Sequence, residues 1–263
     1  MGILTIRNTY SKSPRRALVV FTSDPAKEAR RKQLDQSVEK SRLIYRAFLR
    51  HLLNIARAAQ SQMPFELVFV SDAGDQKNIH RAAEVFPELP PVHFITHHGD
   101  SFGEKIQHAL STTFSNGYDQ VAIIGNDCLD LTPEILTHTF TELETQETVL
   151  GPAKDGGFYL LGLRRFDARL FENVQWCGAQ VSDQISANIG QLHRSLAILP
   201  TLKDIDSYRD LFNWLCQTQT ANRWLIRYLR HLLLQTGFRQ MFIPPVIRHR
   251  QLCRWKWQLP PPA

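Results

Sequence analysis

The chain has 263 residues, of which 43% are hydrophobic and 21% are charged, with a formal net charge of +6. These values are ordinary for a globular protein and exclude a disordered or fibrous chain. The four cysteines are widely spaced and form no CxxC pair, which argues against a zinc ribbon or a disulfide scaffold and fits a reducing compartment. Residues 1–16 lack the apolar core of a secretion signal, and no apolar run reaches the roughly 18 residues that span a bilayer. We therefore expect a cytoplasmic protein.

Strands and helices are expected to alternate along most of the chain. Short apolar runs rich in Val, Ile and Phe predict strands at residues 17–22, 65–71, 92–96, 120–125, 149–151, 158–163 and 196–199. Apolar residues at helical spacing predict one long helix from Pro25 to about Ala59, and further helices at 76–86, 102–114, 182–192, from Pro133 onward and from Asp206 or Ser207 onward. This alternation is typical of a mostly parallel sheet with helices on both faces, so we expect a three-layer α/β/α sandwich.

The positive charge is concentrated near the C-terminus. From Leu211 to Ala263 there are seven arginines, one lysine and no acidic residue, whereas the remaining 210 residues carry 23 basic and 25 acidic side chains. Four of the five tryptophans also lie in that segment. We therefore expect an N-terminal extension at residues 1–16, an α/β domain at 17–211 and a basic, partly helical extension at 212–263.

Residues 221–236 of this extension predict an amphipathic helix, with Leu, Trp and Tyr on one face and arginines between them. One interpretation is a helix packed on the body with a basic outer face. The other is a peripheral contact with anionic lipid at the inner face of the membrane. No nucleic-acid-binding module surrounds the segment, so we expect no nucleic-acid partner.

Acidic residues follow predicted strands, which is where ligands bind in open α/β sheets. Asp127 and Asp130 lie in the turn after strand 120–125, and Asp206 follows strand 196–199. Carboxylate oxygens suit Mg²⁺ or Mn²⁺, so these three aspartates are candidate metal ligands. Two alternatives stay open, because Asp130 could simply shape the start of the next helix and Asp206 could be a helix N-cap.

A third acidic segment, Asp155-Gly156-Gly157, lies between two predicted strands. Asp-Gly-Gly is a common turn signal. Two consecutive glycines could instead let the backbone approach a substrate closely, which makes Gly156 and Gly157 candidates for contact with a sugar or an acceptor.

Taken together, these segments resemble DUF2064, a family of small bacterial proteins described as glycosyltransferase-like or nucleotide-diphospho-sugar transferase-like, some of them as arsenosugar-biosynthesis-type glycosyltransferases. The matching stretches are residues 102–105, 117–132, 150–163 and 204–207. The resemblance implies a nucleotide-binding sandwich of the GT-A class. It does not settle a reaction, because a fold can carry many functions.

The chain departs from the family after the first strand. Members usually carry Pro-x-Pro-Gly-x-x-Lys-Thr-Arg-Leu, where this chain has residues 25–34, with Glu28 in place of the glycine and Arg31 in place of the lysine. Lys27, Arg31 and Lys32 keep the segment basic and are candidate phosphate ligands, although a solvated helix face is the simpler interpretation. Asn126, beside the candidate metal ligand Asp127, is a further nucleotide-binding candidate.

Among the reactions that this fold carries, we expect a metal-dependent glycosyltransferase that uses a nucleotide-diphosphate-sugar donor, an unknown acceptor and Mg²⁺ or Mn²⁺ as cofactor. Asp155 is the candidate general base for the acceptor hydroxyl, or it orients the sugar. A nucleotidylyltransferase is the first alternative, but such enzymes hold a triphosphate on a glycine-rich loop, and no glycine occurs between Gly2 and Gly74. A non-catalytic nucleotide-binding or scaffold protein is the second alternative.

Three residues beside these motifs are expected to have structural roles. We expect Lys105 to shape the start of a helix and Cys128 to be a small packing residue rather than a nucleophile. Trp176 could line the acceptor pocket, but packing is the simpler interpretation.

Overall fold

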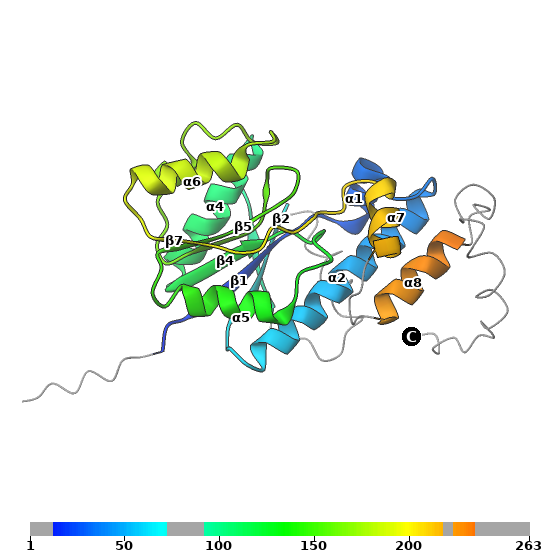
Figure 1. Cartoon of the computed structure of the whole chain (residues 1–263), viewed down its shortest axis with the longest axis horizontal. Coiled ribbons are helices and arrows are strands. Elements are labelled where there is room, and N and C mark those ends of the chain that lie inside the picture. The colour runs from blue at the N-terminus through cyan, green and yellow to red at the C-terminus, as the bar shows by residue number, and fades with distance from the viewer. Residues whose placement is uncertain (1–12, 73–91, 218–222, 235–263) are drawn as a thin grey trace, which may run out of the picture.

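The computed structural model describes residues 13–72, 92–217 and 223–234 (Figure 1). Within them a seven-stranded sheet has the order β3-β2-β1-β4-β6-β5-β7. Its strands are β1 (Arg16–Phe21), β2 (Glu66–Ser71), β3 (Val92–Thr96), β4 (Gln120–Ile124), β5 (Thr148–Pro152), β6 (Phe158–Leu163) and β7 (Leu196–Ile198). Every strand predicted from the sequence is therefore confirmed within one or two residues at each end.

The pairing is parallel among β3, β2, β1 and β4, and between β5 and β7. Only β6 is antiparallel to both of its neighbours, β4 and β5. The central strand β1 is buried along most of its length, which explains why its sequence is continuously apolar instead of alternating. The prediction of a mostly parallel sheet is confirmed.

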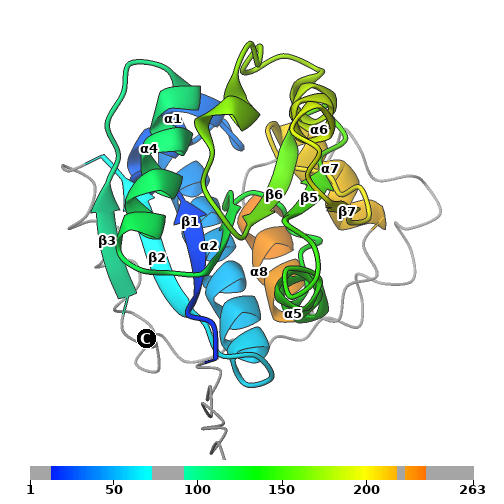
Figure 2. The same cartoon turned by 90° about the vertical axis from the view of Figure 1, so that its left-hand side faces the viewer.

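Helices cover both faces of this sheet, as Figures 1 and 2 show. The helices are α1 (Pro25–Lys32), α2 (Val38–Gln60), α4 (Phe102–Ser115), α5 (Pro133–Glu142), α6 (Val181–Gln191), α7 (Tyr208–Gln217) and α8 (Arg223–Leu234), with a 3₁₀ turn η1 (Ala168–Phe171). One hydrophobic cluster joins α2 and α5 to one face of the sheet, and another joins α4 and α6 to the opposite face. The predicted α/β/α sandwich is confirmed. The predicted helix at 76–86 lies outside the described residues.

The prediction of one long helix from Pro25 to Ala59 is wrong, because the chain breaks between α1 and α2. Gln33 adopts a left-handed conformation, with φ of 45°, directly after α1. The Asp35 carboxylate then accepts a hydrogen bond from the Ser37 backbone N–H, and the Ser37 hydroxyl caps α2. The break turns α1 across the carboxyl end of β1, where it lines the pocket described below.

The helices α7 and α8 pack against α1 and the first half of α2 in a third hydrophobic cluster. The leucines of α8 supply its buried face: Leu225, Leu229, Leu232 and Leu233. Its arginines Arg223, Arg227 and Arg230 are exposed. This arrangement favours the packed-helix interpretation, since leucines buried against α2 are not available to lipid. In the described part of the chain, no helix combines the length and the apolar character needed to cross a membrane.

Candidate functional site

A pocket of about 690 Å³ lies at the carboxyl ends of β1, β2, β3 and β4. This is the edge at which open α/β sheets bind ligands, and the volume is in the range of small-molecule sites. The N-terminal residues of β6, the helices α1 and α4, and loops around residues 176–181 and 204–206 complete its lining. The sequence-predicted acidic segments therefore meet at one edge of the sheet, as their positions after strands suggested.

Asp127 is held in this pocket by the backbone around it. Its carboxylate folds back over Gly125, where a Cβ would lie 2.8 Å from Asp127 Oδ1. Its backbone carbonyl accepts a hydrogen bond of 3.0 Å from the Ile205 N–H. That bond ties the turn after β4 to the Asp204–Asp206 segment, which is nearly 80 residues further along the chain.

Lys32, the last residue of α1, bridges two of the predicted metal ligands. Its ammonium nitrogen lies 2.5 Å from Asp127 Oδ2 and 2.7 Å from Asp206 Oδ1. Only 9% of the lysine side chain is exposed. Burial lowers the pKa of Lys32, but attraction to Asp127 and hydrogen bonds to both carboxylates outweigh it, so that the pKa lies above its ordinary value. Lys32 is therefore a charged partner of these carboxylates rather than part of a solvated helix face.

Asp204 joins this acidic group, and sequence reasoning did not select it as a site residue. Its pKa is raised well above the ordinary value, first by burial and then by repulsion from Asp127, Asp155 and Asp206. Its Oδ1 atom is buried and has no hydrogen-bond partner among the described residues. A buried carboxylate oxygen without a donor is costly, so this position suits a further positive group.

The structure does not bring Asp130 into the pocket. Its Oδ1 atom accepts a hydrogen bond of 2.7 Å from the indole N–H of Trp214, on α7. Asp130 is also absent from the pocket lining. Asp130 therefore binds α7, and the start of α5, which Asp130 was thought to shape, is capped by Thr132 instead.

Asp206 is not the N-cap of α7. The hydroxyl of Ser207 accepts the Asp210 N–H at 3.2 Å and donates to the Asp210 carboxylate at 2.6 Å, so Ser207 is the cap. Asp206 is left free to pair with Lys32 at the pocket edge, which removes the capping alternative for it.

The other basic candidates after β1 already have partners. Arg31 lines the pocket, but its guanidinium bonds the Glu28 carboxylate at 2.7 Å. Glu28 is buried and lies where the family pattern has glycine, and Arg31 lies where the pattern has lysine, so these two departures from the pattern form one ion pair. Lys27 lies 3.4 Å from Asp72 and is not among the residues that line the pocket.

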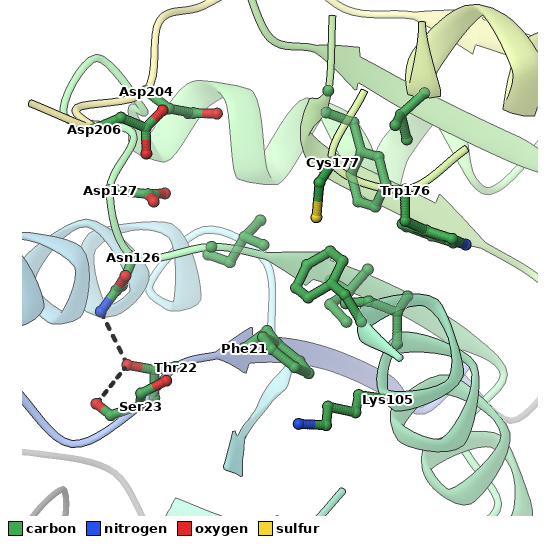
Figure 3. A pocket seen from close by; sticks show the side chains of 18 of the residues that line it. Phe21, Thr22, Ser23, Lys105, Asn126, Asp127, Trp176, Cys177, Asp204 and Asp206 are labelled. Atoms are coloured by element: carbon green, nitrogen blue, oxygen red, sulfur yellow. Dashed lines mark hydrogen bonds between the residues drawn. The ribbon is translucent and has the colours of Figure 1, made fainter. Parts of the chain in front are cut away.

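Asn126 lies in the pocket as predicted, but it also has a local role. Its amide donates a hydrogen bond of 2.9 Å to the hydroxyl of Thr22, at the end of β1 (Figure 3). The bond holds the ends of β1 and β4 together beneath Asp127.

The Cys128 thiol, one residue after Asp127, has a pKa raised by burial, which fits a packing residue.

The Asp155-Gly156-Gly157 segment combines a turn with a pocket contact. Asp155 Oδ1 accepts the Gly157 N–H at 2.9 Å, and Asp155 Oδ2 has no hydrogen bond among the described residues. Gly156 has a φ of 92°, and a Cβ there would lie 1.9 Å from the carbonyl oxygen of Ala179. A glycine is therefore needed at position 156 because the Ala179 backbone lies too close for any side chain. Asp155 and Gly157, in contrast, line the pocket.

The opposite wall of the pocket consists of aromatic rings, including Trp176, for which a place in the pocket was the less favoured of two alternatives. Phe102 is 45% exposed and makes edge contacts with Phe21 and Trp176, at centroid distances of 5.5 and 5.7 Å. His97 stacks on Phe21 at 5.3 Å. The Trp176 indole lies over Gly103, where a Cβ would come within 2.1 Å of the ring, so this glycine is required by the approach of the ring.

Lys105 belongs to the same wall. Its side chain points toward the pocket in Figure 3, and no acidic partner is found for it among the described residues. The neighbouring Glu104, in contrast, forms a capping box with Ser101 at the start of α4. The expectation that Lys105 only shapes the helix therefore missed its position in the pocket.

The charge of the lining decides whether a cation fits this pocket. The acidic residues that line it are Glu28, Asp72, Asp127, Asp155, Asp204 and Asp206, and the basic ones are Arg31, Lys32 and Lys105. Even with Asp204 neutral, which its raised pKa favours, the lining keeps an excess of acidic over basic residues that would repel a diphosphate. The oxygen donors and the unpartnered Asp204 Oδ1 suit a divalent cation such as Mg²⁺ or Mn²⁺. As the side chains stand, however, no group of three or more His, Cys, Asp or Glu among the described residues is placed to hold a metal ion. Asp127 and Asp206 are instead paired with Lys32.

The chain matches the family model of DUF2064, described as uncharacterized proteins conserved in bacteria, over residues 54–178. It is also similar to a presumed nucleotide-diphospho-sugar transferase from Desulfovibrio desulfuricans G20, with a TM-score of 0.71 and 25% identity over 84% of this chain and 97% of that one. These findings confirm the resemblance predicted from the sequence. No curated protein matches the chain.

A second similar structure is a 4-diphosphocytidyl-2C-methyl-D-erythritol synthase from Anaerococcus prevotii DSM 20548. Its TM-score is 0.51 and its identity is 11%, over 82% of this chain and 96% of that one. At this identity the likeness shows the fold alone. The fold is therefore that of the nucleotide-diphospho-sugar transferases, and it includes enzymes of more than one reaction type.

Proposed function

We propose that this protein is a glycosyltransferase that uses a nucleotide-diphosphate sugar as donor and Mg²⁺ or Mn²⁺ as cofactor. The observation that carries the proposal is a pocket with carboxylates on one wall and aromatic rings on the other, at the carboxyl edge of the sheet. The first wall suits a cation with a diphosphate, and the second suits an uncharged ring such as a sugar.

The start of α1 favours glycosyl transfer over nucleotidylyl transfer. Asp24 accepts hydrogen bonds from the first backbone N–H groups of α1. Its carboxylate accepts from the Ala26 N–H, and its backbone carbonyl accepts from the N–H groups of Lys27 and Glu28. A loop that cradles a triphosphate needs such N–H groups free to reach the phosphates. This segment is a capped helix without glycine, so it supplies no such cradle.

The proposed roles follow from the positions of the side chains. Asp127, Asp204 and Asp206 would hold the cation, which supplies positive charge for the leaving diphosphate. Lys105 and Arg31 line the pocket and would bind phosphate oxygens. Asp155 would accept the proton of the acceptor hydroxyl through its free Oδ2 atom, since a general base needs a carboxylate within hydrogen-bond reach.

A thermal-shift panel tests this proposal against its alternatives. The full-length protein is heated with nucleoside diphosphates, nucleoside triphosphates and nucleotide-sugars, each with Mn²⁺ and with EDTA, because a ligand that binds the native state raises the Tm. Stabilisation by one diphosphate-sugar with Mn²⁺ is the expected result. Stabilisation by a triphosphate but by no diphosphate-sugar would favour a nucleotidylyltransferase. No response to any nucleotide would favour a non-enzymatic role.

For the acceptor side, we propose a narrower form of the predicted contact with anionic lipid. It leaves out α8 and is limited to residues 235–263, which lie outside the described residues. This segment retains Arg239, Arg248, Arg250, Arg254 and Lys256 beside Trp255 and Trp257. The full-length protein should sediment with anionic vesicles and less so at high salt. Substituting the arginines of this segment by glutamine should abolish the effect, and equal sedimentation with neutral vesicles would contradict it.

A further inference from the structure

Lys32 makes an unusual pair of contacts for a pocket residue. Its single ammonium group reaches the carboxylates of Asp127 and Asp206, which belong to two different loops. Burial of the ammonium group is costly unless it is paired, and here both partners are carboxylates within hydrogen-bond distance. The lysine therefore stands where a cation shared by these two loops would stand.

From this geometry we infer that Lys32 and a divalent cation compete for the Asp127–Asp206 pair. The inference rests on the cation of the proposed function and specifies how this chain regulates its binding. A divalent cation such as Mg²⁺ binds carboxylate oxygens at about 2.0–2.1 Å. The Lys32 ammonium group lies 2.5 Å from Asp127 Oδ2 and 2.7 Å from Asp206 Oδ1, so a divalent cation bound to both carboxylates would lie a few ångströms from its positive charge and be repelled by it.

Charge decides the direction of this competition. The pocket lining has more acidic than basic residues, so a doubly charged ion compensates it better than a single ammonium group. The Lys32 ammonium group, however, is attached to α1 and is always present at the two carboxylates, whereas a metal ion must be bound from solution. Metal binding must therefore displace an ion pair already in place, which weakens metal affinity and frees an ammonium group beside the pocket.

The test measures binding of Mn²⁺ alone to the full-length protein by isothermal titration calorimetry, without nucleotide. The Lys32→Met variant keeps the length of the side chain but removes its charge, and Lys32→Arg keeps the charge. Lys27→Met is the matched control, because it removes a lysine charge from the same helix α1 without touching Asp127 or Asp206.

We expect Lys32→Met to bind Mn²⁺ at least about tenfold more tightly than the wild-type protein, because a unit charge a few ångströms from the ion is removed. Lys27→Met and Lys32→Arg should each stay within about threefold of the wild type. A Tm for each variant, measured without metal, shows that the comparison is between folded proteins.

Equal or weaker Mn²⁺ affinity in folded Lys32→Met would overturn the competition while leaving the proposed cation in place. If neither the wild-type protein nor Lys32→Met binds Mn²⁺, the cation of the proposed function fails together with the competition. An equal gain in Lys27→Met would also overturn the inference, since it would show a general charge effect of α1.

Discussion

The two walls of the pocket differ in chemistry and in how the chain builds them (Figure 3). The acidic wall joins Asp127, after β4, to the Asp204–Asp206 segment through the Ile205–Asp127 backbone bond. The aromatic wall joins Phe21, at the end of β1, to Phe102 on α4 and to Trp176. The first wall is held by hydrogen bonds and ion pairs, whereas the second is held by ring contacts.

This difference assigns the two walls to different parts of one ligand. A wall of carboxylates binds cations and repels phosphate unless a cation lies between them. A wall of rings contributes through apolar and π contacts, which are insensitive to metal. A nucleotide-diphosphate sugar has both kinds of group, so variants of each wall should fail in distinguishable ways.

The largest effect is expected at the acidic wall, for Asp127→Asn. Loss of this carboxylate should weaken Mn²⁺ binding and Mn²⁺-dependent nucleotide binding by about 100-fold, because removal of one partner from a buried charged pair costs about 2–5 kcal/mol. Calorimetric titration of Mn²⁺ measures the first effect.

Asp130→Asn is the matched control for this variant, because Asp130 lies in the same turn but bonds Trp214 outside the pocket. Its Mn²⁺ affinity should stay within about threefold of the wild type, a difference of less than about 1 kcal/mol. Equal losses in both variants would contradict the division between Asp127 and Asp130.

A second prediction concerns what lies behind the acidic wall. Trp214→Phe removes the indole N–H that bonds the Asp130 carboxylate, and should lower the free energy of unfolding by about 1–3 kcal/mol. Urea unfolding measures this loss. Trp224→Phe on α8 is the control, since Trp224 is half-buried and stacks on Tyr228. Its free energy of unfolding should fall by clearly less than that of Trp214→Phe. An unchanged free energy of unfolding in Trp214→Phe would show that the hydrogen bond between Trp214 and Asp130 contributes nothing to stability.

At the aromatic wall, Phe102→Ala should weaken binding of the nucleotide-sugar by about fivefold, or about 1 kcal/mol, and leave Mn²⁺ affinity unchanged. The exposed Phe102 ring contacts Phe21 and Trp176 in the pocket. Ile198→Ala is the control, because Ile198 is 65% exposed on β7, away from the pocket lining. A change in Mn²⁺ affinity without a change in sugar affinity would break the division between the walls.

The smallest effect separates capping from binding at the end of the acidic wall. Ser207→Ala removes the cap of α7 and should lower the free energy of unfolding by about 0.5–1 kcal/mol, with Mn²⁺ affinity retained. Asp206→Asn should show the reverse pattern, with weaker Mn²⁺ binding and little loss of stability. A loss of stability in Asp206→Asn equal to that in Ser207→Ala would mean that Asp206 supports α7 after all.

The order of strands and helices was predictable because it depends on local patterns. Apolar runs mark the buried strands, and Asp24-Pro25 and Thr132-Pro133 mark helix starts that the structure confirms. The break between α1 and α2 was missed because the apolar residues at helical spacing, such as Leu43, Ala47 and Leu53, all lie in α2, and the helix was extended from them back to Pro25. The signal that could have found it is Asp35-Gln36-Ser37, since Asp and Ser compete with the helix by bonding nearby backbone.

The candidate site was most predictable where acidic residues follow a strand. Asp127, Asp155 and Asp206 meet that condition, and all three line the pocket. The role of Lys32 depends on a contact across 95 residues, and the aromatic wall depends on three segments that meet only in the folded chain. Neither leaves a local pattern in the sequence, so spacing alone could not have assigned them.

The central claim is that a cation joins the acidic wall to a nucleoside diphosphate. Calorimetric titration of UDP, GDP, ADP and CDP into the full-length protein, with Mn²⁺ and with EDTA, tests it most directly. The account predicts that at least one of them binds with Mn²⁺, and that EDTA weakens this binding by about 100-fold or more, since an excess of acidic residues then faces the diphosphate. Binding of equal affinity in Mn²⁺ and in EDTA would contradict the account.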